Sequence, residues 1–259
     1  MNDFGKRAVR AVKAALIRLP ADTDNVAHNR ALWNRYAIKW NRERIGVQQL
    51  ETTEDDFRTQ ISHLGDEWGS PSHVDAVLDD FLFPLLSTDI SALEIGVGGG
   101  RIADKVSPRV KNLTCCDISG EMLARAKLDL AKHDNITYTL LDEPGLPVPD
   151  NSFDVIYSFD VFVHIDLHTQ WRYFAEISRA LKPGGHAFLH TSNLRAPGGW
   201  DEFTSQDHYS VSGHYFVTPD TIALFAEKAG LEIVKDSTPA ADNFYLHRDY
   251  LFVLKKPGV

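Results

Sequence analysis

The sequence predicts an α/β protein: a mostly parallel, doubly wound sheet with helices on both faces, preceded by a helical cap. Two observations predict this class. From residue 92 onward, short apolar and β-branched runs alternate with helical segments, the pattern of a parallel sheet covered by helices. A glycine-rich turn follows the first run and opens the first of these helices. We therefore expect a cap region over residues 1–88 and a sheet domain over residues 89–259.

Composition fits a globular chain. The 259 residues are 43% hydrophobic and 24% charged, enough for one sizeable core with an appendage or for two smaller cores. No long apolar stretch and no compact apolar block near the start is present, so we expect no stable membrane insertion, no secretory signal and a cytoplasmic location. The adjacent Cys115 and Cys116 form neither a disulfide framework nor the paired spacing of a zinc site. A net charge of −9 disfavours nucleic-acid partners.

The cap region is expected to be helical. Its first helix has a basic and an apolar face, which indicates a solvated helix docked on its own domain, with a membrane-surface helix as the alternative: Lys6, Arg7, Val9, Arg10, Val12, Lys13, Leu16, Arg18 and Leu19. Residues 20–24 end this helix and cap a second one, which runs through Ala31, Tyr36 and Trp40. A short helix starts near residues 51–56, and another covers Val74 to Leu86.

The sheet domain is expected to contain five parallel strands, at Ala92 to Gly96, Leu113 to Asp117, Ile136 to Leu141, Phe153 to Ser158 and His186 to Thr191. Helices are expected between them at Arg101 to Val106, Glu121 to His133 and Leu167 to Leu181. A polar and aromatic insertion follows at residues 193–217. A helix from Thr221 to Ala229 and two strand-like runs, Leu231 to Lys235 and Tyr250 to Leu254, complete the chain.

The glycine turn reads Glu94-Ile95-Gly96-Val97-Gly98-Gly99-Gly100. Glycines in this context let a ligand approach the backbone at the end of a strand. A dinucleotide-binding pattern would have another glycine at position 101, where this sequence has Arg101. Asp117 ends the second strand about twenty residues later, where it can accept hydrogen bonds from a ribose diol. The pattern therefore predicts a nucleoside cofactor and departs from that of nicotinamide enzymes.

Four blocks in a fixed order resemble the class I S-adenosylmethionine-dependent methyltransferases, whose fold is Rossmann-like. They are the glycine turn, the run Asp117-Ile118-Ser119-Gly120-Glu121-Met122-Leu123, the run from Leu146 to Ile156, and Arg179-Ala180-Leu181-Lys182-Pro183-Gly184-Gly185. Together they span residues 92–193. The resemblance implies S-adenosylmethionine as cofactor, S-adenosylhomocysteine as product and a small-molecule acceptor.

The resemblance also implies roles for single residues. Gly96 and Gly98 pass the amino acid moiety of the cofactor, and Glu94 faces its ammonium group. Asp117 takes the ribose hydroxyls, while Ile118 and Met122 enclose the adenine. Further expected cofactor residues are Asp142 with its neighbour Glu143, Ser158, Phe159 and, from the cap, Tyr36.

His164 is the candidate catalytic residue. Methyl transfer depends on positioning, but a hydroxyl acceptor must lose its proton as the new bond forms, and a histidine is a suitable general base. His164 follows the fourth strand, in a segment that borders the methyl-transfer centre in the family; the alternative is a structural histidine bonded to the backbone. Asp160 lies four residues earlier and would share a helical face with it, which makes a divalent metal an alternative. Some methyltransferases that hold a divalent ion beside the acceptor hydroxyl have a second carboxylate just before this histidine. This sequence has Val163 at that position, so we expect no metal.

Six polar and aromatic side chains are expected to contact the acceptor: Asp160, His190, Trp200, His208, His214 and Tyr215. We therefore predict methyl transfer to a hydroxyl group of a sugar or polar ring metabolite. An N-methyltransferase and a lipid or quinone O-methyltransferase are alternatives, as are a nucleotide-dependent oxidoreductase and a non-catalytic nucleoside-binding subunit. The sequence fixes neither the acceptor nor the oligomeric state and leaves a homodimer open.

Overall fold

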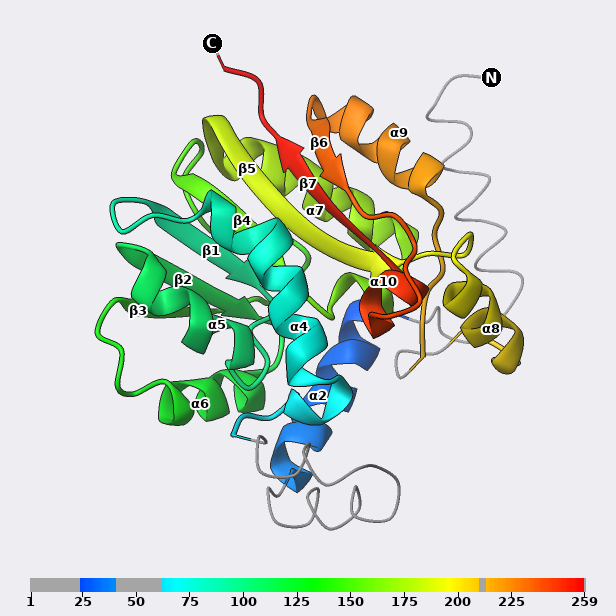
Figure 1. Cartoon of the computed structure of the whole chain (residues 1–259). Helices are drawn as coiled ribbons and strands as arrows, with labels where there is room; N and C mark the ends of the chain where they lie inside the picture. The colour runs from blue at the N-terminus through cyan, green and yellow to red at the C-terminus, as the bar shows by residue number, and fades with distance from the viewer. Residues whose placement is uncertain (1–23, 41–61, 210–212, 259) are drawn as a thin grey trace, which may run out of the picture.

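The computed structural model describes residues 24–40, 62–209 and 213–258. Its centre is a seven-stranded sheet with the strand order β3-β2-β1-β4-β5-β7-β6 (Figure 1). All neighbouring strands pair in parallel except β7, which is antiparallel to both β5 and β6. The strands are β1 (Ser91–Ile95), β2 (Asn112–Asp117), β3 (Ile136–Leu140), β4 (Phe153–Ser158), β5 (Leu181–Ser192), β6 (Glu232–Asp236) and β7 (Asp249–Lys255).

Helices cover both faces of the sheet, as predicted. The first face carries α4 (Pro71–Val77), η3 (Leu78–Leu82), α5 (Arg101–Val106) and α6 (Gly120–Asp129), and the second carries α7 (Leu167–Ala180) and α9 (Pro219–Ala229). The other helices and short turns are α2 (Asn25–Lys39), η2 (Asp66–Trp68), η4 (Phe83–Leu85), η5 (Ser107–Arg109), η6 (Phe162–His164), α8 (Pro197–Ser205) and α10 (Phe244–Arg248). The Rossmann-like fold class is confirmed.

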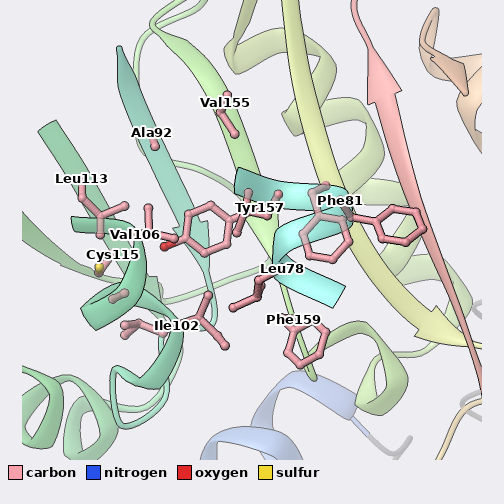
Figure 2. Packing of buried hydrophobic residues seen from close by; sticks show 14 of the residues in the cluster. Leu78, Phe81, Ala92, Ile102, Val106, Leu113, Cys115, Val155, Tyr157 and Phe159 are labelled. Atoms are coloured by element: carbon pink, nitrogen blue, oxygen red, sulfur yellow. The ribbon is translucent and has the colours of Figure 1, made fainter. Parts of the chain in front are cut away.

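Two apolar clusters, one on each face, hold these layers together. The first cluster contains Leu78 and Phe81 from η3, Ile102 from α5 and Tyr157 of β4 (Figure 2). Burial of such side chains is the main favourable term in folding, on the order of 25 cal/mol per Å² of apolar surface. Alternate residues of each strand point to opposite faces, so β1 places Ala92 in this cluster and its neighbour Leu93 in the other.

Side-chain caps fix where the helices around the sheet begin. Ser119 Oγ accepts a hydrogen bond from Met122 N at 3.1 Å at the start of α6, and Asp166 caps α7. Gly230 ends α9 with φ 69°, a conformation that glycine adopts at little cost. Because β1, β2 and β4 run in parallel, the loops that follow them meet at one edge of the sheet.

Helix α2 lies beyond this edge (Figure 1), where hydrogen bonds from its polar side chains hold it. Arg30 Nε donates to Ile118 O at 3.1 Å, and its Nη2 donates to the carbonyl oxygens of Leu141, at 3.1 Å, and of Asp142. Asn29 Nδ2 donates to His164 O at 3.0 Å. The second helix expected from the sequence is thus present. The first helix and the start at residues 51–56 fall outside the described residues, so the complete cap and its border at residue 88 stay predictions.

The structure differs from expectation in several elements: α6 ends at Asp129 rather than at His133, and α10 was not expected. The segment Val74 to Leu86 is not one α-helix: α4 gives way to a π-helical turn and a 3-10 turn, because Pro84 lacks the N–H that would bond to Asp80 O. Lys235 Nζ donates to that carbonyl instead, at 2.8 Å. Strand β5 begins at Leu181, five residues earlier than expected. The insertion contains the helix α8, which its two consecutive glycines, Gly198 and Gly199, concealed.

Candidate active site

A cavity opens at the carboxyl ends of β1, β2 and β4, under α2. Nine residues that the sequence predicted as functional line it: Glu94, Gly96, Gly98, Asp117, Ile118, Met122, Phe159, Asp160 and His164. The carboxyl ends of parallel strands, at the point where the strand order reverses between β1 and β4, are the usual ligand position in such sheets. The topology therefore brings together residues that are up to seventy positions apart in the sequence.

Gly96 and Gly98, two glycines of the turn, have different roles. A Cβ atom on Gly96 would lie 2.4 Å from Val161 Cγ2, and φ at Gly96 is 79°, so the backbone requires glycine there. Gly98 also has a positive φ of 54°, yet a Cβ atom there would meet nothing within 4 Å. Gly98 N donates to Asp117 Oδ2 at 2.9 Å, which ties the turn to the end of β2. Gly98 thus leaves space beside a carboxylate, where a ligand can approach the backbone.

Glu94 is a buried acid in the cavity wall. Tyr157 OH donates to its Oε2 at 3.1 Å, and the thiol of Cys115 lies 3.9 Å from the same oxygen. Burial raises the pKa of the Glu94 carboxyl well above its ordinary value, although the hydrogen bond from Tyr157 opposes this. Its other oxygen, Oε1, accepts no hydrogen bond from the described residues. The carboxyl therefore retains an acceptor for a cationic group entering the cavity.

Asp117 is buried at the end of β2. Its Oδ1 accepts from Ser119 N at 2.8 Å, and its Oδ2 accepts from Gly98 N. Burial raises its pKa to about 6, and these two backbone N–H groups limit the rise. Ile118 and Met122 line the same part of the cavity. A carboxylate beside two apolar side chains suits a ligand that carries hydroxyl groups next to a flat ring.

Asp160 follows β4 with φ 56°, a conformation unusual for a residue other than glycine. Its Oδ2 accepts from Arg101 Nη2 and, at 3.1 Å, from Tyr245 OH, while its backbone N donates to His190 Nδ1 at 3.0 Å. Burial alone would raise the pKa of Asp160, but Arg101 and His190 outweigh it and hold the pKa far below its usual range. Asp160 thus borders the cavity as a permanently ionised carboxylate. The groups that form hydrogen bonds with it are side chains of the protein itself.

The positive φ of Asp160 also corrects one expectation. Asp160 and His164 do not share a helical face, because the helical turn η6 begins only at Phe162. The pair is therefore not arranged as metal ligands on one turn. Within the described ranges, no group of three or more histidine, cysteine or acidic side chains is placed to hold a metal ion.

His164 lies where the cavity meets the insertion. Its Nδ1 is 2.9 Å from the carbonyl oxygen of Gly213, and its ring packs edge-on against Trp33 and face-on against His214, with centroid distances of 5.0 and 5.9 Å. Burial lowers the pKa of His164 to about 4, and repulsion from His214 adds to this. The imidazole is consequently neutral near pH 7. Because a carbonyl oxygen can only accept, Nδ1 carries the proton and Nε2 has the free electron pair.

Four expected cofactor residues do not line the cavity. Asp142 and Glu143 are exposed, and Asp142 meets α2 through its carbonyl oxygen. Ser158 is buried and donates to Ile95 O at 2.8 Å. Tyr36 OH donates to Glu67 Oε1 at 2.7 Å and accepts from Trp68 Nε1 at 3.3 Å, which joins α2 to η2. None of these four side chains is among the residues that line the cavity.

The expected acceptor residues also lie apart from the cavity, with the exception of Asp160. His190 is fully buried between Asp160 and Asp249, with Nε2 3.0 Å from Asp249 Oδ2. Trp200 and His208 are exposed. Tyr215 N donates to Val163 O at 2.7 Å, and His214 reaches the site only through its stacking on His164. The described residues of the insertion therefore contact His164, whereas the cavity is lined by the ends of β1, β2 and β4 together with residues of α2, η2 and α5.

Sequence reasoning missed the aromatic and basic part of the wall. Trp33 of α2, Trp68 of η2 and Arg101 of α5 all line the cavity. Trp33 has the spacing of a core residue, and Trp68 lies in a segment with no periodic pattern. Arg101 was visible only as a departure from a glycine pattern. Its place directly after the glycine turn was the one signal that could have identified it.

Comparison with known proteins gives a consistent result. A family model described as "Methyltransferase domain" matches residues 93–189. Phosphoethanolamine N-methyltransferase 2 of Caenorhabditis elegans is 35% identical over 99 residues, covering 37% of this chain and 22% of the relative. The ubiquinone/menaquinone biosynthesis C-methyltransferase UbiE of Rickettsia bellii is 35% identical over 85 residues, covering 29% and 34%. The chain thus matches about a third or less of the length of these relatives.

Among solved structures, the N-methyltransferase NodS of Bradyrhizobium japonicum in complex with S-adenosylhomocysteine has a TM-score of 0.58. It is 17% identical, and the likeness covers 89% of this chain and 99% of that one. At this identity the likeness establishes the fold. No helix of the described residues is both long and apolar enough to cross a membrane. The family match falls on the strands and loops that build the cavity, from β1 to β5.

Proposed function

Because residues 93–189 form a methyltransferase domain of the class I S-adenosylmethionine-dependent family, we propose that this protein transfers a methyl group from S-adenosylmethionine to a hydroxyl group of a small polar molecule. The cavity beside Gly98 carries the proposal: an unobstructed glycine, a ribose-type acid in Asp117 and a spare carboxyl oxygen on Glu94 converge there. Bound S-adenosylmethionine supplies an electrophilic methyl group. The residues present fit its adenosine and amino acid parts.

His164 is the general base in this proposal. Its Nδ1–H is fixed by Gly213 O, which leaves Nε2 to take the proton of an acceptor hydroxyl. A neutral imidazole with a lowered pKa is ready to accept that proton at pH 7, although its low basicity limits the driving force. A hydroxyl acceptor needs both a base and correct orientation, whereas a neutral amine is already nucleophilic and needs orientation alone. The presence of a base therefore favours an oxygen acceptor.

The wall beyond Gly98 favours a sugar or polar ring compound as acceptor. Trp33 and Trp68 present aromatic surface to the cavity, and their ring centroids are 5.7 Å apart. Such surfaces pack against the faces of sugar and aromatic rings. Residues of helix α2 line this side of the cavity, and a cover that excludes water from the reacting groups would strengthen electrostatic interactions inside it.

An amine acceptor is the second candidate, because two comparisons lead to proteins named N-methyltransferases. A neutral amine needs no base, so this candidate predicts turnover that is insensitive to the loss of His164. A protein that binds nucleosides without catalysis is the remaining alternative, and it predicts binding without turnover.

Calorimetry with S-adenosylhomocysteine, followed by transfer of a labelled methyl group to a panel of sugars, phenols and amines, tests the proposal. We expect micromolar or tighter nucleoside binding and labelled hydroxyl products. Binding of NAD in preference to S-adenosylhomocysteine would refute the class of reaction. Labelled amines alone would replace the hydroxyl acceptor with the second candidate.

A further inference from the structure

His190 is a buried histidine of β5 that packs behind a wall of the cavity. Its ring contacts those of Phe159 and Tyr245, with centroid distances of 4.7 and 5.5 Å. Phe159 lines the cavity, whereas His190 is fully buried and does not. A buried imidazole costs free energy unless its nitrogens have polar partners, so the partners of His190 indicate what it does.

The first ring nitrogen, Nδ1, meets Asp160, which borders the cavity. Asp160 N donates to Nδ1 at 3.0 Å, and Asp160 Oδ1 lies 3.3 Å from the same nitrogen. Nδ1 accepts from the peptide when the ring is neutral and can donate to the carboxylate when the ring is protonated. Burial alone would lower the pKa of His190, but Asp249 and Asp160 outweigh it and raise the pKa to about 9. In either protonation state, Asp160 is therefore the partner of Nδ1.

The second ring nitrogen, Nε2, faces the neighbouring strand of the sheet. It lies 3.0 Å from Asp249 Oδ2, at the start of β7. Arg248 donates to the same oxygen through Nε at 3.0 Å and through Nη2 at 2.7 Å. Because β7 pairs with β5, which carries His190, this carboxylate has a fixed place beside the ring. The imidazole thus lies between a paired strand on one side and Asp160 on the other.

Asp160 is a residue whose backbone needs support, because its φ of 56° is unfavourable for a side chain with a Cβ atom. It belongs to the cavity loop, residues 159–164, which follows β4 and lines the cavity with four of its residues. Val161, the next residue, packs so closely on the glycine turn that a Cβ atom on Gly96 would lie 2.4 Å from its Cγ2. His164 stands at the other end of the loop. A change in the backbone of Asp160 would therefore displace both contacts.

We propose that His190 is a positioning residue for methyl transfer: it holds Asp160 in its left-handed conformation and so sets the path of the cavity loop. Its importance for turnover rests on the proposed function, because that function makes His164 the base. Its hold on the loop needs no ligand. The alternative is a histidine that only fills the core. The two differ in which replacement of His190 preserves the site.

Three variants separate these roles. His190→Asn keeps an amide close to the place of Nδ1, where it can still meet Asp160, whereas His190→Gln carries its amide toward Asp249 and His190→Leu has no polar group. We expect His190→Asn to bind S-adenosylhomocysteine within about threefold of wild type, and the other two to bind it about tenfold or more weakly. Single-turnover transfer to an acceptor identified by the panel above should fall about 100-fold in the same two variants. Calorimetry measures the affinities, and urea unfolding gives the stability of each variant.

Amide exchange of residues 159–164 in the ligand-free protein provides a second readout. Exchange should be about as slow in His190→Asn as in wild type, and about tenfold or more faster in His190→Gln and His190→Leu. His186→Asn is the matched control, because His186 is half-buried on the same strand and is absent from the cavity lining. It should change neither the affinity nor the exchange. If His190→Leu fails to fold, the comparison of asparagine with glutamine decides.

The outcomes distinguish the inference from the proposed function. If affinity and amide exchange simply follow the free energy of unfolding, with His190→Asn no better than His190→Gln at equal stability, His190 is a core residue and the inference is overturned. If wild type binds no S-adenosylhomocysteine, the proposed function fails, and amide exchange still tests the hold on the loop. Slow exchange in His190→Asn with fast exchange in His190→Gln then supports that hold, and equal exchange in both contradicts it.

Discussion

The imidazole Nδ1 of His164 lies 2.9 Å from the carbonyl oxygen of Gly213. This contact joins the loop after β4 to the insertion after β5, two segments forty-nine residues apart. It selects one tautomer of the histidine, because the carbonyl can only accept a hydrogen bond. The insertion therefore acts on the chemistry by orienting His164, although its own aromatic side chains lie outside the cavity.

Replacing His164 with glutamine should lower the rate of transfer to a hydroxyl acceptor by about 100-fold or more, because general-base catalysis is lost. The affinity for S-adenosylhomocysteine should change less than about threefold, since His164 lies at the acceptor side of the site. Single-turnover kinetics and calorimetry measure the two effects. His168→Gln is the matched control, because His168 is exposed on the neighbouring helix. Equal loss of rate and affinity would show a structural role.

The affinity for S-adenosylhomocysteine should fall as the pH is lowered through about 6. Asp117 has a raised pKa of about 6, and a ligand that donates hydroxyl groups to its carboxylate prefers the ionised form. Above pH 6 the group is already ionised, and below it each pH unit should weaken binding by up to about tenfold. Calorimetry between pH 5 and 8 measures this.

Asp117→Asn provides the control for that pH dependence. The variant should bind more weakly at pH 8 and should lose the step near pH 6, while the exposed Asp134→Asn should behave like wild type. A step that persists in Asp117→Asn would assign the titration to another group, with Glu94 the first candidate because burial also raises its pKa.

Alanine at Gly96 and alanine at Gly98 should have different consequences. Gly96→Ala places a methyl group 2.4 Å from Val161 Cγ2, so it should destabilise the fold by about 2 kcal/mol or more. Gly98→Ala meets nothing within 4 Å and should cost only about 1 kcal/mol of backbone strain, yet it should weaken nucleoside binding by at least about tenfold. Urea unfolding and calorimetry separate the effects. Gly120→Ala, which has space and no positive φ, is the control.

Replacing Arg30 with alanine should loosen α2 over the cavity. The side chain donates to three carbonyl oxygens at the ends of β2 and β3, and charged hydrogen bonds contribute about 1.5–3 kcal/mol when formed. We expect faster amide exchange in residues 24–40 and a dissociation rate for S-adenosylhomocysteine that rises about three- to tenfold. Arg35→Ala on the exposed side of the same helix should change neither. Unchanged amide exchange in Arg30→Ala would mean that other contacts, such as those of Asn29, are sufficient to hold α2 over the cavity.

Much of the fold could be predicted from local pattern. Strand β4 and helix α5 have the predicted bounds, and the two strand-like runs near the end of the chain became β6 and β7. Pairing of β7 antiparallel to β5 could not be predicted this way, because it depends on which edge of the sheet remains open after β5 is placed. The same limit applies to α8, where glycines lower helix propensity and packing against α10 compensates.

The sequence by itself determined the sheet, the glycine turn and the acids at its strand ends, because these follow from short-range spacing and from residues that must adopt particular backbone conformations. Only the tertiary structure decided which side chains share the cavity. His190 and Arg101 illustrate the difference: alternation along β5 left the direction of His190 open, and packing buried it behind Asp160. The guanidinium of Arg101 reaches the cavity beside Trp68 and Phe159, thirty-three residues before and fifty-eight after it, whose ring centroids lie 5.6 and 5.5 Å away. Contacts between segments so far apart depend on how the elements pack, which no local pattern encodes.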